Sequence, residues 1–104
     1  MGGSSQKTFL NFLNRTKVIE SNKFAIDIQK NLLSTLEDKY LHIKDNGVRE
    51  APFWVLVGAQ MPAVLVEIGF ITNPLEAKRM RTKQYQNTLA KGIANGIDSY
   101  FYHN

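Results

Sequence analysis

The sequence predicts an α/β fold class, as a fragment of a larger mixed sheet covered by helices on both faces, with two strands and three to four helices in this chain. Helical periodicity dominates residues 17–39 and 83–101, and two short apolar runs lie between them. The second run, "AVLVEI" at residues 63–68, is apolar on both of its faces. That pattern is typical of strands in a sheet that helices cover on both sides.

Length and composition restrict the chain to one small globular domain. It has 104 residues, of which 43% are hydrophobic and 21% charged. The net charge is +4, but the basic residues are scattered, so no nucleic-acid partner is expected. The absence of cysteine excludes disulfides and thiolate metal sites. We expect no transmembrane segment and no signal peptide, because no apolar stretch approaches the roughly 20 residues that span a bilayer.

The first part of the chain is predicted to be helical. Residues 7–15 are interpreted as a short amphipathic lead-in, and residues 17–39 as a long surface helix with one buried face. The apolar residues of that face recur at helical spacing: Val18, Ala25, Ile28, Leu32 and Leu36. Residues 45–47, Asp-Asn-Gly, then predict a turn.

The two apolar runs are predicted to form an antiparallel hairpin. Only five residues, 58–62, separate the run at 52–57 from the run at 63–68, whereas a parallel crossover needs a dozen or more. A sheet of two strands is only marginally stable in water. We therefore expect the remaining strands to belong to polypeptide outside this chain.

Glu67 is the unusual residue of the second run. Burying a carboxylate costs several kcal/mol unless a partner compensates for the lost hydration. A symmetric hairpin would place Phe53 opposite Glu67, with Arg49 just beyond. Ligands gather outside the carboxyl ends of strands in open α/β sheets, which favours a functional role for Glu67. The structural alternative is an ion pair with Arg49, or hydrogen bonds from the backbone N–H groups near Gly69 and Phe70.

The stretch "TNPLEAKRM" carries the signals of a helix start. Asn73 is a good N-cap, Pro74 suits the first helical position, and Glu76 stands at the third, where it can complete a capping box. We therefore expect a helix to begin at Pro74.

A last helix is predicted from about Lys83 to Phe101. Its inward stripe comprises Tyr85, Leu89, Ile93, Ile97 and Tyr100. Gly92 and Gly96 form a G-x-x-x-G pattern among polar residues, which favours close packing of this helix on a sheet over a membrane helix pair.

The segments "NGVREAPFWVLVGAQMPAVLVEIGFITNPLEAKRM" and "YQNTLAKGIANGIDSY" closely resemble the C-terminal half of zinc-dependent N-acetylmuramoyl-L-alanine amidases, the bacterial cell-wall amidases of the Amidase_3 type. The resemblance runs from about Thr16 to Tyr102, and "MPAVLVEIGFITNP" is its most specific part. It implies that residues 1–104 are the C-terminal part of one catalytic domain. Residues 1–6 are interpreted as a natural or artificial linker and residues 7–16 as a lead-in segment.

The resemblance also implies a reaction and a catalytic residue. These amidases are peptidoglycan hydrolases, which cleave the amide between N-acetylmuramic acid and the L-alanine of the stem peptide. The glutamate at the position of Glu67 is catalytic in that family, where it would orient or deprotonate a zinc-bound water. A zinc ion close by would offset the cost of burying this carboxylate. Arg49 and Phe70 are candidates for substrate binding.

The metal ligands, in contrast, are expected outside this chain. His42 and His103 show no metal-ligand spacing, so we expect no metal ligand here and place the Zn²⁺ ligands in the preceding half of the domain. The resemblance thus implies three partners: peptidoglycan, the N-terminal half of the same catalytic domain, and an activator protein. It implies a periplasmic or other extracytoplasmic location and an isolated chain without activity. The alternative is a non-catalytic module that binds the cell wall or a protein.

Overall fold

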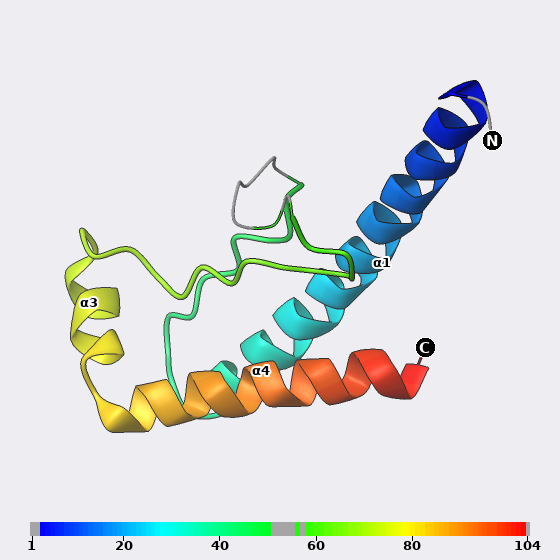
Figure 1. Ribbon diagram of the computed structural model, residues 1–104. Helices are drawn as coiled ribbons and strands as arrows, with labels where there is room; N and C mark the ends of the chain where they lie inside the picture. Colours follow the sequence, from blue (N-terminus) through cyan, green and yellow to red (C-terminus); the bar gives the residue numbers. More distant parts are fainter. Residues whose placement is uncertain (1–2, 51–55, 57, 104) are drawn as a thin grey trace.

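Three helices are formed by the residues that the computed structural model describes, which are 3–50, 56 and 58–103. They are α1 (Gly3–Glu37), α3 (Pro74–Met80) and α4 (Lys83–His103) (Figure 1). Between α1 and α3 the described chain consists of turns and extended stretches. None of the helices in the described ranges combines the length and the apolar character that crossing a membrane requires.

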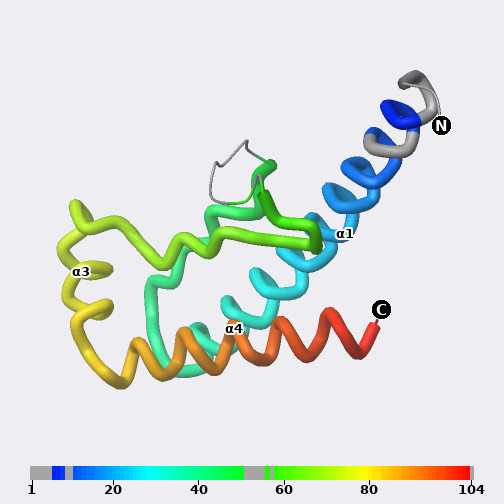
Figure 2. The backbone as a smooth tube through the Cα atoms, viewed as in Figure 1, coloured from blue at the N-terminus to red at the C-terminus, as the bar shows by residue number. Residues whose placement is uncertain are grey.

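Helix α1 is continuous from Gly3 to Glu37, so residues 7–15 are helical as expected and form the first turns of the long helix predicted over residues 17–39. Its sequence explains the continuity, because neither glycine nor proline occurs between Ser4 and Tyr40 to interrupt the helix. Beyond Glu37 the backbone makes one more turn, in which the Tyr40 N–H donates to the carbonyl of Leu36 at 2.8 Å. The first turns of α1 project beyond the other elements (Figure 2).

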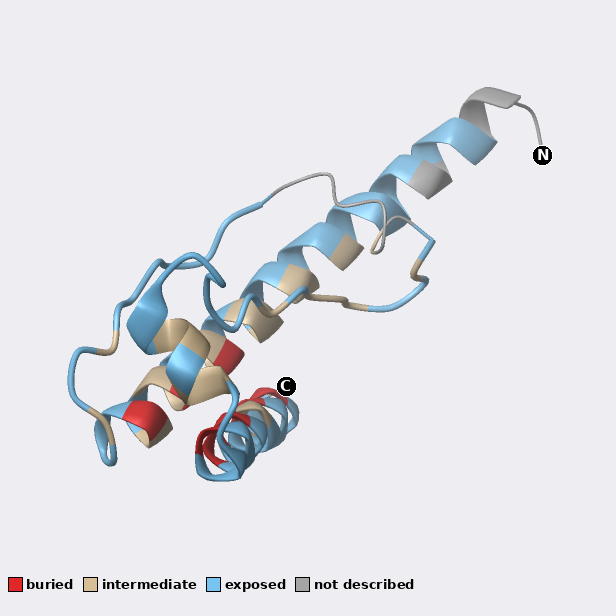
Figure 3. Cartoon of the chain, turned by 90° about the vertical axis from the view of Figure 1, so that its left-hand side faces the viewer, coloured by how far each residue is buried: buried red, intermediate tan, exposed pale blue. Residues whose placement is uncertain are grey.

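The core lies where α1 and α4 pack against each other in an antiparallel arrangement. Buried residues gather at this contact (Figure 3): Ile28, Leu32 and Leu36 from α1, and Tyr85, Leu89 and Tyr100 from α4. The predicted inward faces of both helices are thus confirmed for these six residues. Ile97 and Val18 depart from the prediction and are 37% and 49% exposed. Val18 lies beyond the level at which Tyr100 meets α1 near Glu20.

Gly92 and Gly96 allow the two helices to approach closely. A Cβ atom on Gly96 would lie 2.5 Å from the Cα of Ile28, and one on Gly92 would lie 3.0 Å from the Cα of Leu32. The prediction of close packing is therefore confirmed, but the partner is helix α1, whereas we had expected a sheet.

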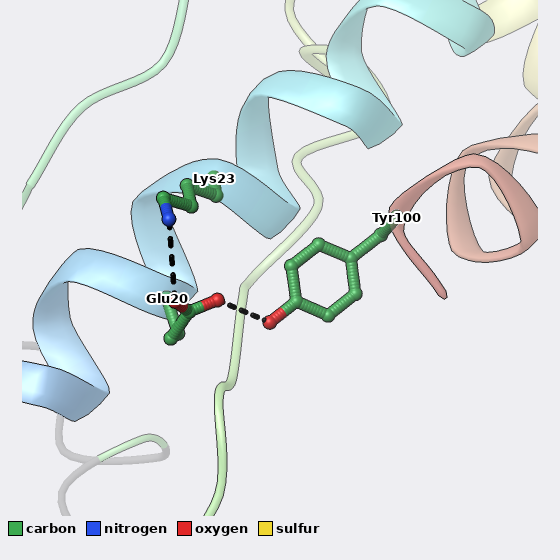
Figure 4. A network of polar contacts seen from close by, with 3 residues as sticks. All are labelled: Glu20, Lys23 and Tyr100. Atoms are coloured by element: carbon green, nitrogen blue, oxygen red, sulfur yellow. Dashed lines mark hydrogen bonds and ion pairs between the residues drawn. The ribbon is translucent and has the colours of Figure 1, made fainter. Parts of the chain in front are cut away.

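A polar contact joins the far end of α4 to α1 (Figure 4). The Tyr100 hydroxyl donates to Oε2 of Glu20 at 2.7 Å, and the other oxygen of that carboxylate lies 3.4 Å from Nζ of Lys23. The hydrogen bond from Tyr100, assisted by Lys23, lowers the pKa of Glu20. The same bond to Glu20, together with burial of the phenol, raises the pKa of Tyr100.

The predicted α/β fold class is wrong for this chain, because the described residues form helices and no sheet. Residues 63–68 are extended but belong to no strand, and the run at 52–57 lies outside the described residues except for Leu56. A strand is completed only by the hydrogen bonds of a neighbouring strand. The described part of the chain supplies no such neighbour for residues 63–68, so their β-type sequence remains extended and unpaired.

Candidate functional site

Glu67 lies on an extended stretch that leads from α1 to α3 and that we call the Glu67 segment, residues 63–70 (Figure 1). Val64 and Val66 are half-buried, and Val66 packs against the core. Leu65 and Glu67 alternate with them and are exposed, as expected for extended backbone. The expectation of a buried Glu67 carboxylate is therefore wrong in this structure, and no burial cost has to be compensated.

Helix α1 fixes the start of the Glu67 segment. The Ala63 N–H donates to Oγ of Ser21 at 2.9 Å, and the ammonium of Lys17 donates to the carbonyl of Leu56 at 3.0 Å. Lys17 and Ser21 lie one turn apart on the same face of α1. They therefore hold both ends of the loop that leads into the Glu67 segment.

Helix α3 fixes the other end of the segment. The Phe70 N–H donates to Oε2 of Glu76 at 2.8 Å. Asn73 is the N-cap of α3, as predicted, and its side-chain oxygen accepts from the N–H groups of Leu75 and Glu76 at 3.0 and 3.1 Å. The predicted capping box is only half formed, because the Glu76 carboxylate binds Phe70 and leaves the N–H of Asn73 to the carbonyl of Phe70.

Gly69 makes this end of the segment possible. Its φ of 149° lies in a range that residues with side chains rarely adopt. A Cβ atom at this position would also lie 3.2 Å from Sδ of Met80. The turn after Glu67 can therefore rest directly on α3.

Glu67, Arg49 and Phe70 line one cavity of ≈ 920 Å³. Its walls are the stretch of α1 from Lys17 to Leu36, residues 42–44 and 46–50, and the Glu67 segment, together with Glu76 and Arg79 of α3 and Tyr85 and Leu89 of α4. The cavity thus brings together the three residues that the sequence singled out.

Their side chains do not bind one another. Within the described ranges the Glu67 carboxylate and the Arg49 guanidinium form no hydrogen bond or ion pair. The Phe70 N–H is occupied by Glu76, so the structural alternative proposed for Glu67 is not realised at that group. Glu67 is exposed at the cavity, and its carboxylate accepts no hydrogen bond from the residues that the structure describes. Phe53, predicted to lie opposite it, falls outside the described residues.

The cavity wall that carries Arg49 is held to α1 by Asp45. Its Oδ1 accepts from Nε2 of Gln29 at 2.9 Å and from the N–H of Gly47 at 2.8 Å. Gly47 has a φ of 77°, and its bond to Asp45 closes a local turn through that side chain, but the described residues 45–47 form no turn closed by backbone hydrogen bonds. The bond from Gln29, followed by that from Gly47, lowers the pKa of Asp45.

The described residues do not fit a complete metal site. No group of three or more His, Asp or Glu side chains in these ranges could hold a metal ion. His42 is exposed, with a φ of 60°, in the turn after α1. His103 lies near the end of α4, where its ring contacts that of Tyr102. His42 thus follows α1 and His103 ends α4, and among the described residues neither belongs to a group of side chains that could bind a metal ion.

Sequence reasoning missed Ser21 and Lys17 and misjudged the contact of Glu76. A signal was present for Ser21, because its hydroxyl lies on the same helical face as Val18, Ala25 and Ile28. A polar group on an inward face usually has a hydrogen-bond partner. The identity of that partner, 42 residues further along the chain, is a tertiary feature that no local pattern contains.

Comparison with known proteins gives a consistent result. The family model described as N-acetylmuramoyl-L-alanine amidase matches residues 4–99. The protein YqiI of Bacillus subtilis is 44% identical over 81 residues, which cover 78% of this chain and 37% of YqiI. A putative N-acetylmuramoyl-L-alanine amidase of Buchnera aphidicola subsp. Acyrthosiphon pisum is 36% identical over 94 residues, covering 86% of this chain and 39% of the relative.

A third relative is also matched over only part of its length. The N-acetylmuramoyl-L-alanine amidase LytC of Bacillus subtilis is 36% identical over 81 residues, which cover 78% of this chain and 15% of LytC. The chain therefore spans between 15% and 39% of the lengths of these three relatives. No solved structure matches the chain significantly.

Proposed function

Because the chain belongs to the N-acetylmuramoyl-L-alanine amidase family, we propose that it is the C-terminal part of a peptidoglycan-hydrolysing catalytic domain. Such a domain cleaves the amide between N-acetylmuramic acid and the L-alanine of the stem peptide. In this proposal the domain works outside the cytoplasm, where peptidoglycan lies. The match of residues 4–99 to the family model is the observation that carries the proposal.

Glu67 is the catalytic residue that this chain contributes. Its carboxylate is exposed at the ≈ 920 Å³ cavity and makes no hydrogen bond within the described ranges, so either oxygen can accept a proton. In the proposed reaction it accepts the proton of the attacking water and returns it to the departing amine nitrogen. Arg49 and Phe70 line the same cavity and are its proposed contacts with substrate.

The metal ligands are supplied by polypeptide outside this chain. A catalytic zinc takes about three protein ligands and leaves a position open, and no such group exists among the described residues. When bound, zinc would supply an activated water and polarise the scissile carbonyl. The chain spans at most 39% of the three relatives described above, which leaves ample sequence in such proteins for the ligands. That N-terminal half is the proposed partner.

Reconstitution tests this function. The 104-residue chain is combined with the preceding part of a relative's amidase, and the release of L-alanine-terminated peptides from peptidoglycan is measured with zinc present. We expect turnover by the combination and none by the chain alone. Glu67→Gln should lower kcat at least about 100-fold with peptidoglycan binding retained, whereas Glu37→Gln, an exposed carboxylate at the end of α1, should change nothing.

Two results would overturn the proposal. Unchanged turnover in Glu67→Gln would assign catalysis to another group and favour a non-catalytic binding module. Tight 1:1 zinc binding by the isolated chain, measured by calorimetry, would show that this chain builds its own metal site.

A further inference from the structure

Among the described residues, the backbone of the Glu67 segment is hydrogen-bonded at its two ends and not between them, where Val66 makes an apolar contact with the core. The Ala63 N–H is bound by Ser21 and the Phe70 N–H by Glu76. Between these two contacts, residues 64–69 form no backbone hydrogen bond with any described residue. The position of Glu67, four residues from one tether and three from the other, therefore depends on both.

Each tether is itself fixed to a helix. Ser21 belongs to α1 and is half-buried. Lys17, one turn earlier on α1, binds the carbonyl of Leu56, ahead of the segment. Glu76 belongs to α3, which meets α4 through Gln86, whose Nε2 donates to the carbonyl of Met80 at 2.8 Å. The two tethers thus connect the Glu67 segment to the α1–α4 core from opposite ends.

We propose that Ser21 and Glu76 are positioning residues, which set the place of the Glu67 carboxylate through the backbone of its segment. This inference rests on the proposed function, because it assumes that Glu67 reacts. The physical reason is that a displacement of about 1 Å at a reacting group can cost roughly 100-fold in rate. Neither side chain touches substrate in this account; each acts only through an amide of the segment.

The first test concerns geometry and uses the 104-residue chain without any partner. Amide hydrogen exchange is followed by NMR at Ala63 and Phe70. Ser21→Ala should accelerate exchange at Ala63, and Glu76→Ala should accelerate it at Phe70, each by about fivefold or more. Ser21→Thr and Glu76→Gln, which retain an acceptor oxygen, should restore most of the protection. Ser34→Ala and Glu37→Ala alter exposed side chains of α1 and serve as matched controls.

The second test concerns catalysis in the reconstituted amidase. Ser21→Ala and Glu76→Ala should each lower kcat by roughly 10-fold to 100-fold while KM changes less than about twofold, because the reacting group moves and the substrate contacts do not. The Thr and Gln variants should recover most of the rate. A merely structural role would instead lower the yield of folded enzyme and leave the kcat of the folded fraction unchanged.

The outcomes separate this inference from the proposed function. If Glu67→Gln abolishes turnover but both alanine variants keep the wild-type kcat, the positioning role is wrong and the function stands. If Glu67→Gln retains turnover, the function fails and the positioning role fails with it. Unchanged exchange at both amides would show that the tethers do not hold the segment in solution, which also overturns the inference.

Discussion

The two main helices approach each other closely at Gly96 and Ile28, since a Cβ atom on Gly96 would lie only 2.5 Å from the Cα of Ile28. Real Cβ atoms do not come so near to a backbone atom, so any side chain at this position would force α1 and α4 apart. The core residues Leu32 and Leu89 lie in the same contact. Separation of the helices would therefore loosen the whole core.

Gly96→Ala is expected to destabilise the chain by up to about 2 kcal/mol. Overpacking of a tight contact costs roughly 1–3 kcal/mol, and the better helix propensity of alanine returns only about 1 kcal/mol. Gly92→Ala should cost less, because the nearest backbone atom, the Cα of Leu32, would lie 3.0 Å away, compared with 2.5 Å at Gly96, and the contact at 2.9 Å is Cδ1 of Leu32, the end of a flexible side chain. Urea unfolding followed by circular dichroism measures both changes.

Asn95→Ala, on the exposed side of α4, is the matched control and should be neutral or slightly stabilising. Equal or greater stability of Gly96→Ala would contradict the close approach of the two helices.

The contact between Tyr100 and Glu20 should make stability depend on pH at both extremes. The folded-state pKa of Glu20 lies below its ordinary 4.5, so its contribution is present above that value and is lost as the pH falls through the lowered pKa. The pKa of Tyr100 is raised above its ordinary 10.0, so its contribution is present below that value and is lost as the pH rises through the raised pKa. The loss from Tyr100→Phe should therefore be constant between about pH 5 and 9 and shrink outside that range.

The measurement is the free energy of unfolding across pH for the wild type and for Tyr100→Phe. Tyr102→Phe provides the control, since Tyr102 is 86% exposed and should leave the profile unchanged. A difference between wild type and Tyr100→Phe that stays the same down to pH 3 would show that the contribution of the Tyr100 hydroxyl does not depend on the charge of Glu20, which contradicts this prediction.

Asn73→Ala should weaken α3 without unfolding the core. The lost N-cap costs about 1 kcal/mol, and α3 has no buried residue of its own to offset the loss. Because Glu76 lies in the first turn of α3, the Phe70 amide should exchange faster as well. Asn73→Asp, which retains an acceptor oxygen at the N-cap, should preserve both. Unchanged exchange throughout residues 74–80 in Asn73→Ala would argue against this cap.

The features that could be predicted from the sequence are those that local patterns encode. The helical spacing of Ile28, Leu32 and Leu36 is a property of α1 alone, and so is the start of α3 at Asn73 and Pro74. The α1–α4 pairing is different, because the spacing of Gly92 and Gly96 predicts that another element packs closely against this helix but does not identify that element. We expected a sheet there, and the structure places a helix.

The Glu67 segment marks the limit of such reasoning. Its β-branched residues suit a strand, but a strand exists only when a neighbour completes its hydrogen bonds, and none is present among the described residues. The candidate residue Glu67 was found through its odd position and through family resemblance. Its exposure, and the hydrogen bonds of Ser21 and Glu76 at the ends of its segment, depend on tertiary contacts that only the structure contains.

Tyr40 provides a last prediction, because its hydroxyl is buried and has no hydrogen-bond partner in the part of the chain that the structure describes. Its ring packs edge-on against that of Tyr85, with centroids 5.0 Å apart, and the Arg79 guanidinium lies 5.3 Å from the ring centre. Tyr40→Phe keeps both ring contacts and removes an unsatisfied polar group, so it should stabilise the fold by roughly 0.5–1.5 kcal/mol. Tyr40→Leu loses the ring and should destabilise it. Thermal unfolding of the two variants measures the effects, and a destabilised Tyr40→Phe would reveal a partner for the hydroxyl, such as an ordered water.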